Sequence, residues 1–137
     1  MKTGFKERRK YKRALFSIDQ GLAGQFALSG KEIEASKPLV APILDISEGG
    51  VGFVLDPIYG EKIGIDDKLV LTQLSICVGD QKRVLSLKSH LPMTVRGKIT
   101  ADFLSHVGVG CDFTKITSDL WSEIKDFIEK IYPNCIV

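Results

Sequence analysis

"TVRGKITADFLSHVGVGCDF", residues 94–113, is the stretch that decides the fold. Apolar side chains alternate with polar residues or glycine along 94–104 and again along 106–113, which is the period of a β-strand with one buried face. Because only a short link at Ser105 separates the two runs, they predict a β-hairpin. Gly97 stands in the inward register of the first run, which indicates a barrel bend or a close approach of another backbone.

Similar apolar runs occur upstream, separated by breaks that contain glycine or proline. The runs "LVAPILDI" (39–46), "GVGFVL" (50–55) and "KLVLTQLSICV" (68–78) predict three more strands. In the third run the alternation changes phase between Leu71 and Leu74, which predicts a β-bulge. The stretch "DPIYGEKIGIDD" between the second and third runs is typical of turns. Short strands at such spacing favour an all-β sandwich or barrel.

The C-terminal part changes period. In "TSDLWSEIKDFIEKIYP" (117–133) the apolar residues recur at the spacing of one face of an α-helix. Thr117 or Ser118 can cap the start of this helix, and Pro133 ends it. We expect the apolar face to pack against the barrel rather than to meet a partner protein.

The composition limits the possible functions. The chain has 137 residues, 44% of them hydrophobic and 26% charged, which fits one folded domain. Its three cysteines and two histidines show neither the spacing of a metal site nor a nucleophile with its base, so we expect no metal, no cofactor and no enzymatic activity. No run approaches the ~18–20 apolar residues of a membrane span, and no signal peptide is evident. We expect the cysteines to be reduced, with Cys77 and Cys111 inside the core. Reduced cysteines favour a cytoplasmic protein.

The charge is unevenly distributed along the chain. Residues 1–13 carry seven basic side chains and one acidic one, whereas the remaining residues carry 12 basic and 16 acidic side chains. Such a basic arm on a mildly acidic body indicates a local site for an anion. Within the arm, Arg9 and Arg13 form an R-x-x-x-R spacing, which puts both on one side of an extended chain. Arginine suits phosphate oxygens and the O6/N7 edge of guanine, because its planar guanidinium donates two parallel hydrogen bonds.

A second motif links two of the predicted strands. Asp45, Ser47 and Gly50 form a D-x-S-x-x-G spacing, and the first two alternate with Ile46, so both are expected on the outer face of the sheet. A carboxylate there can accept hydrogen bonds from the N1–H and N2 amine of a guanine. Gly50 allows a close backbone approach or a positive φ angle. The same residues also fit a simple Asx or Ser turn between two strands.

Together, the two spacings resemble those of the PilZ domain, a family of bacterial receptors for cyclic di-GMP. The resemblance extends to "MTVRGKITADF", to "HVGVGCDF" and to the C-terminal helix, and thus covers nearly the whole chain. It implies a six-stranded antiparallel β-barrel of the PilZ type with a C-terminal α-helix over residues 14–137. It also implies that residues 1–13 are a basic N-terminal arm.

The resemblance assigns two groups of residues to cyclic di-GMP. Arg9 and Arg13 would bind phosphates and guanine faces or edges, with the preceding Arg8 as a secondary candidate that accompanies a stacked, two-molecule form of the ligand. The D-x-S-x-x-G residues would hold the other guanine. The chain departs from the family at none of these motif positions.

The resemblance also implies a mechanism. Like charges and few apolar anchors favour a mobile arm, so we expect the dianionic ligand to order it across the barrel and to expose or cover a surface. With no second domain evident, the output would be an unidentified protein partner or an altered oligomer. Two other interpretations stay open: a small barrel that binds single-stranded nucleic acid, and a PilZ-type adaptor that binds proteins without ligand. The acidic body and the few aromatic residues argue against DNA or RNA, and the intact motifs argue against the adaptor.

Overall fold

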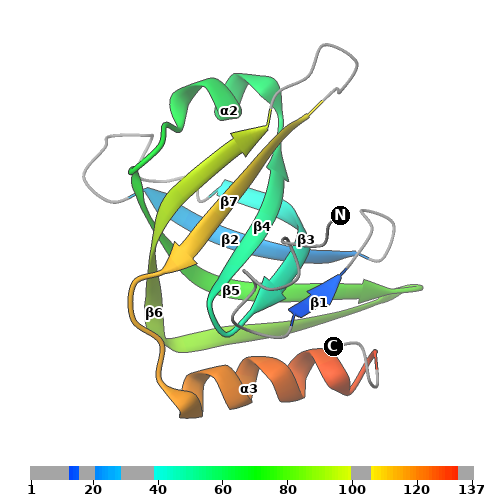
Figure 1. Ribbon diagram of the computed structural model, residues 1–137. Helices are drawn as coiled ribbons and strands as arrows, with labels where there is room; N and C mark the ends of the chain where they lie inside the picture. The colour runs from blue at the N-terminus through cyan, green and yellow to red at the C-terminus, as the bar shows by residue number, and fades with distance from the viewer. Residues whose placement is uncertain (1–12, 16–20, 29–38, 100–105, 133–137) are drawn as a thin grey trace, which may run out of the picture.

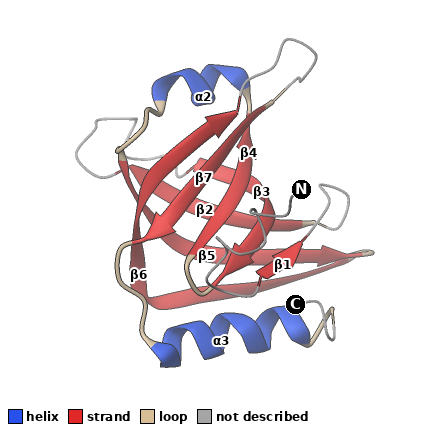
Figure 2. Cartoon of the chain, in the orientation of Figure 1, coloured by secondary structure: helices blue, strands red, loops and turns tan. Residues whose placement is uncertain are grey.

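The computed structural model describes residues 13–15, 21–28, 39–99 and 106–132, with residues 13–15, 88 and 89 described by their backbone alone. The strands form a barrel, with a helix at each end (Figure 1 and Figure 2). In chain order the elements are β1 (Arg13–Leu15), β2 (Leu22–Leu28), β3 (Leu39–Ser47), β4 (Gly50–Leu55), α2 (Pro57–Lys62), β5 (Lys68–Val78), β6 (Gln81–Ile99), β7 (Val107–Phe113) and α3 (Ser118–Glu129).

Six of the described strands close into an antiparallel barrel, as predicted. The order around the ring is β3, β2, β5, β6, β7 and β4, and β4 pairs with β3 again. The additional strand β1 also pairs with β3. Within β3, residues 39–42 pair with β2, residues 43–46 with β4 and residues 45–47 with β1. Most of the predicted basic arm lies outside the described residues, so its boundary with the barrel stays a prediction.

The hairpin predicted from residues 94–113 is present as the pairing of β6 with β7. Val95, Val109 and Cys111 are at most 5% exposed and form part of the core, in keeping with the alternation. The predicted strand over 94–104 is the last part of the longer β6, and residues 100–105 lie outside the description. At Gly97 the expectation is partly wrong: the register shifts after Val95, so Gly97 pairs with Gly110 on the outer face.

The bulge predicted in β5 is confirmed. Leu71 and Leu74 are both fully buried (0% exposed), and the register with β6 shifts between Leu71 and Gln73. The extra residue, Thr72, donates a hydrogen bond from Oγ1 to the carbonyl oxygen of Gln25 at 3.1 Å. One additional residue therefore lets both halves of the strand bury leucine, because it restores the inward phase.

The stretch between β4 and β5 is not turn alone, because it contains the short helix α2. Asp56 caps this helix by accepting a hydrogen bond from the backbone N–H of Ile58 at 3.0 Å, and Pro57 occupies the first turn. The predicted turn follows at residues 64–67, where Asp66 has a φ of 72°. The capping signals were present in the sequence, although the apolar period was too short to predict a helix.

The C-terminal helix packs on the barrel end opposite α2, as predicted (Figure 1). Thr117 caps it by accepting a hydrogen bond from the backbone N–H of Leu120 at 3.1 Å. Ile124 and Ile128 are fully buried, and Trp121 packs against the same core. The amphipathic face is thus used inside the domain.

Candidate functional site

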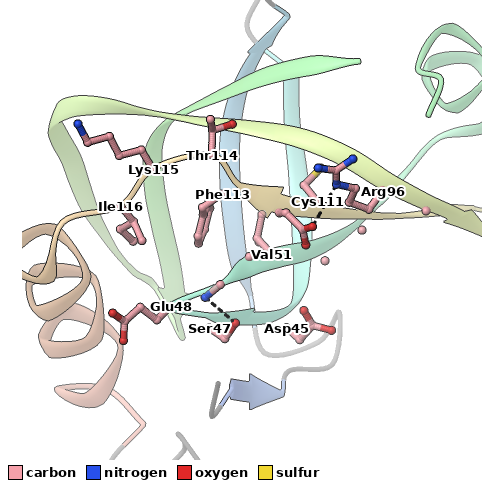
Figure 3. A pocket seen from close by; sticks show the side chains of 16 residues that line it. Asp45, Ser47, Glu48, Val51, Arg96, Cys111, Phe113, Thr114, Lys115 and Ile116 are labelled. Carbon is pink, nitrogen blue, oxygen red and sulfur yellow. Dashed lines mark hydrogen bonds and ion pairs between the residues drawn. The ribbon is translucent and has the colours of Figure 1, made fainter. Parts of the chain in front are cut away.

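A groove lies on the outer surface of β3, β4, β6 and β7 (Figure 3). Its volume is about 970 Å³, near the upper end of the range of ~300–1,000 Å³ that is typical of small-molecule sites. The β3–β4 turn and the first residues of β4 form one wall. The bulged part of β6 and the end of β7, with the segment up to Ile116, form the other.

Asp45 and Ser47 line this groove from the end of β3. Ile46 between them is fully buried, so its two neighbours belong to the outer face, as the alternation predicts. The Oγ atom of Ser47 accepts a hydrogen bond from the backbone N–H of Gly49 at 3.1 Å (Figure 3). Ser47 therefore stabilises the β3–β4 turn, and it also lines the groove.

The carboxylate of Asp45 lies over the backbone of Gly52. The two residues pair across β3 and β4, and a Cβ atom on Gly52 would stand 3.0 Å from Oδ1 of Asp45 and 3.2 Å from its Cγ. Real Cβ atoms rarely come this close to a neighbour, so a side chain at position 52 would push the carboxylate aside. Gly52 thus positions Asp45, a role that the D-x-S-x-x-G spacing did not reveal.

Gly50 is required by the packing of two backbones. A Cβ atom on it would overlap the carbonyl oxygen of Cys111 and stand 3.3 Å from the Cα of Asp112, across the pairing of β4 with β7. Of the two roles expected from the sequence, the close backbone approach is therefore the correct one. The φ angle of Gly50 is not positive.

The strand β1 brings the backbone of Arg13, the second arginine of the R-x-x-x-R spacing, beside the D-x-S-x-x-G motif. Arg13 pairs with Ser47, and Leu15 pairs with Asp45, although more than 30 residues separate the partners in sequence. Arg8 and Arg9 lie outside the described residues, so their place at the groove stays a prediction. The β1–β3 pairing nevertheless fixes where the chain that leads from them enters the barrel.

The opposite wall carries a cation that the sequence reasoning missed. Arg96 lines the groove from β6, and its side chain is 58% exposed. Its Nε atom lies 3.1 Å from Oδ2 of Asp112, and one terminal nitrogen lies 3.4 Å from Oδ1 of Asp66. The only signal in the sequence was the "RG" step inside a strand, since glycine often marks a bulge there.

The model of the PilZ domain family matches residues 7–130, which is most of the chain. This chain belongs to the PilZ family. None of the curated proteins compared with it matches.

Solved structures of three other bacterial proteins share this fold. The PilZ domain of YcgR from Escherichia coli, with c-di-GMP, is 14% identical, with a TM-score of 0.61 over 91% of this chain and 92% of that chain. The MrkH–c-di-GMP complex of K. pneumonia has a TM-score of 0.56 at 16% identity, over 91% of this chain and 52% of that chain. The Bacillus subtilis inhibitor of motility MotI (DgrA) has a TM-score of 0.54 at 18% identity, over 90% of this chain and 53% of that chain.

The PilZ chain described here thus spans about half the length of the MotI and MrkH chains. At these identities the similarity shows the fold.

The cysteines of this PilZ domain differ in their surroundings. Burial, with a smaller contribution from the negative charge of Asp112, raises the pKa of the Cys111 thiol to about 12. Cys111 is therefore a neutral core residue at pH 7, as expected, whereas Cys77 is exposed, which contradicts its predicted place in the core. Cys77 lies near the end of β5, close to the tip of the β5–β6 hairpin. The apolar run continues there although the strand is exposed.

The described part of the PilZ domain contains no group of three or more His, Cys, Asp or Glu residues that could hold a metal ion. In the same residues, neither helix has the length and the apolar run that a membrane span requires.

Proposed function

We propose that this PilZ domain is a receptor for cyclic di-GMP, which binds in the groove between the β3–β4 turn and the β6–β7 hairpin. The pairing of Arg13 with Ser47 supports the proposal most directly, because it brings one of the two motif arginines beside the D-x-S-x-x-G motif at one edge of the groove. Membership in the PilZ family and the c-di-GMP in the similar YcgR and MrkH structures support the identity of the ligand.

Each motif would recognise a different part of the ligand. Arg9 and Arg13 would bind phosphate oxygens and a guanine, because a guanidinium donates parallel hydrogen bonds to both. Asp45, held over Gly52, would accept from the N1–H and N2 amine of the other guanine. Adenine presents no such pair of donors, so this carboxylate would favour guanine. Arg8 would matter where two stacked ligand molecules bind.

Ligand binding would order the N-terminal arm. The arm enters the barrel at β1, next to the groove, so a ligand that bridges the arginines and the β3–β4 turn would fix the arm across this face. The ordered arm would then form or cover a surface for a protein partner. The cytoplasm would be the place of action, in keeping with cysteines that are expected to be reduced.

Isothermal titration calorimetry with cyclic di-GMP tests this function. We expect saturable binding with one or two ligand molecules per chain and clearly weaker binding of cyclic di-AMP. Absence of binding would favour the ligand-free adaptor. Equal affinity for both dinucleotides would contradict guanine recognition by Asp45, and tight binding of single-stranded oligonucleotides with a steep salt dependence would favour the nucleic-acid interpretation.

The position of Asp45 gives a separate prediction. Gly52→Val should weaken cyclic di-GMP binding by about tenfold, since the new side chain displaces the carboxylate and removes about 1.5 kcal/mol of charge-assisted hydrogen bonding. Stability should change little, because the displaced group is the end of a flexible side chain. In a double-mutant cycle measured by calorimetry, Gly52→Val should have a smaller effect in an Asp45→Ala background, where only the obstruction of the groove floor by the new side chain remains. Full additivity of the two losses would show that Gly52 does not act through Asp45.

A further inference from the structure

Arg96 owes its orientation to the bulge in β6. Val95 pairs with Cys111 and Gly97 pairs with Gly110, so Arg96 is the extra residue between two consecutive pairs. A bulge puts an additional side chain on one face of a sheet. Here the extra side chain is on the outer face, where Arg96 lines the groove (Figure 3). It forms an ion pair there with Asp112.

A turn with fixed geometry holds the second carboxylate next to Arg96. The backbone N–H of Asp66 donates to the carbonyl oxygen of Val95 at 2.8 Å, and the backbone N–H of Val95 donates to that of Asp67 at 2.9 Å. These two bonds attach the turn to β6 one residue before the bulge. The guanidinium is thus oriented from both sides before any ligand arrives.

Between Arg96 and Asp45 the groove has a floor of bare backbone. Asp45 pairs with Gly52, Gly52 with Gly110, and Gly110 with Gly97, which lies next to Arg96. This row crosses three inter-strand spacings, or about 14 Å. No atom of the described residues lies within 4 Å of where a Cβ atom of Gly97 or Gly110 would stand, so packing in this part of the chain does not require glycine there.

We propose that Arg96 is a ligand-binding residue that recognises, through its O6/N7 edge, the guanine of cyclic di-GMP that Asp45 does not hold, while Arg9 and Arg13 bind the phosphate oxygens and the face of that same guanine. This inference rests on the proposed function and adds a specificity residue at the end of the groove opposite Asp45. A guanidinium donates two parallel hydrogen bonds to O6 and N7 of guanine, whereas adenine presents an amine in place of O6. The flat floor at Gly97 and Gly110 fits a planar ring that lies against the peptide backbone.

The charges around Arg96 favour a base over a phosphate at this place. The two carboxylates of Asp66 and Asp112 outweigh the single positive charge of the guanidinium, so a phosphate would meet a locally negative surface. A neutral base meets no such repulsion. The recorded contacts use Nε and one terminal nitrogen of Arg96, and a guanidinium has five N–H donors, so donors remain for a base edge.

The existing ion pairs do not oppose this role. All three side chains are more than half exposed, at 58% for Arg96, 76% for Asp66 and 64% for Asp112. Ion pairs between such exposed groups contribute little to stability. The guanidinium can therefore turn part of its donors toward a ligand without loss of the fold.

Calorimetry with two ligands tests the proposal. Native protein and Arg96→Ala are titrated with cyclic di-GMP and with the mixed dinucleotide cyclic GMP–AMP, which can offer guanine to Asp45 and adenine to Arg96. We expect native protein to prefer cyclic di-GMP by about tenfold, which is near the lower end of the discrimination by a bidentate arginine–guanine pair. Arg96→Ala should lose about tenfold for cyclic di-GMP and little for the mixed ligand, so the preference disappears.

Lys98→Ala is the matched control, because Lys98 lies two residues along β6, is not part of the groove lining and carries the same charge. It should leave both affinities within about twofold, and all variants should melt within a few degrees of the native protein. Equal weakening of both ligands by Arg96→Ala would indicate a phosphate contact and overturn the proposal, as would unchanged preference. Failure of native protein to bind cyclic di-GMP would instead refute the proposed function itself.

Discussion

Gly50→Ala should lower the free energy of unfolding by about 3 kcal/mol, with a decrease in melting temperature of about 10 °C. The added Cβ would overlap the carbonyl oxygen of Cys111, and the atoms next nearest to it also belong to backbone. Backbone atoms in a paired strand cannot turn away as a side chain can. The overlap therefore has to be relieved by separating β4 from β7, which opens the barrel ring. Chemical and thermal denaturation of the purified variant measure this effect.

Gly110→Ala is the control for this prediction. Gly110 lies on β7, two residues before the partner of Gly50. No described atom stands within 4 Å of where its Cβ atom would be. The control removes the same conformational freedom from the unfolded chain, so we expect its stability to be unchanged or slightly higher. A Gly50→Ala variant as stable as Gly110→Ala would mean that the β4–β7 contact yields easily, and that Gly50 is needed for another reason.

The strands could be predicted where one face is buried and the other is not. Residues 94–113 alternate cleanly because their inner side chains fill the core, so the hairpin was predicted correctly from its period. The bulge in β5 was also predictable, because a single extra residue leaves a visible change of phase. The amphipathic α3 gave an equally strong signal over more than three turns.

Other elements gave no such signal. The strand β2 contains two alanines and a glycine, so its alternation is weak although Phe26 lies at the centre of the core, stacked on Phe53 with ring centroids 4.3 Å apart. The first half of β6 is largely exposed and polar because it extends along a long hairpin with β5. Such segments form strands because they pair with neighbouring strands. This pairing depends on residues far apart in the chain, so the local sequence pattern does not predict it.

The site divides in the same way. Asp45, Ser47 and Gly50 form one continuous motif, so the sequence predicted their common location. The roles of Gly52 and Arg96 depend on three pairings among four strands and on a bulge, and these appear only when the barrel closes. The pairing of Arg13 with Ser47 is likewise long-range, and the resemblance to PilZ domains predicted only that both residues bind the same ligand.

The largest effect on binding is expected from removal of both motif arginines. Loss of one charged hydrogen-bonding partner costs about 2 kcal/mol or more, so Arg9→Ala and Arg13→Ala together should cost about 4 kcal/mol. This corresponds to a loss of roughly 1,000-fold in affinity for cyclic di-GMP. Arg13 begins the additional strand β1, and the six-stranded ring closes without that strand. The barrel should therefore remain folded, and calorimetry of the double variant can be interpreted as a change in the site.

The chain offers a matched control within the same motif. Lys10→Ala with Lys12→Ala removes two positive charges from positions interleaved with the arginines, so the net charge of the arm falls by the same amount. If the arginines bind by planar, bidentate hydrogen bonds, the lysine double variant should lose only a few-fold in affinity, and most of that loss should vanish in high salt. Comparable losses in the two double variants would mean that the arm attracts the ligand by charge alone. The R-x-x-x-R spacing would then have no specific role, and recognition would rest on Asp45 and the opposite wall of the groove.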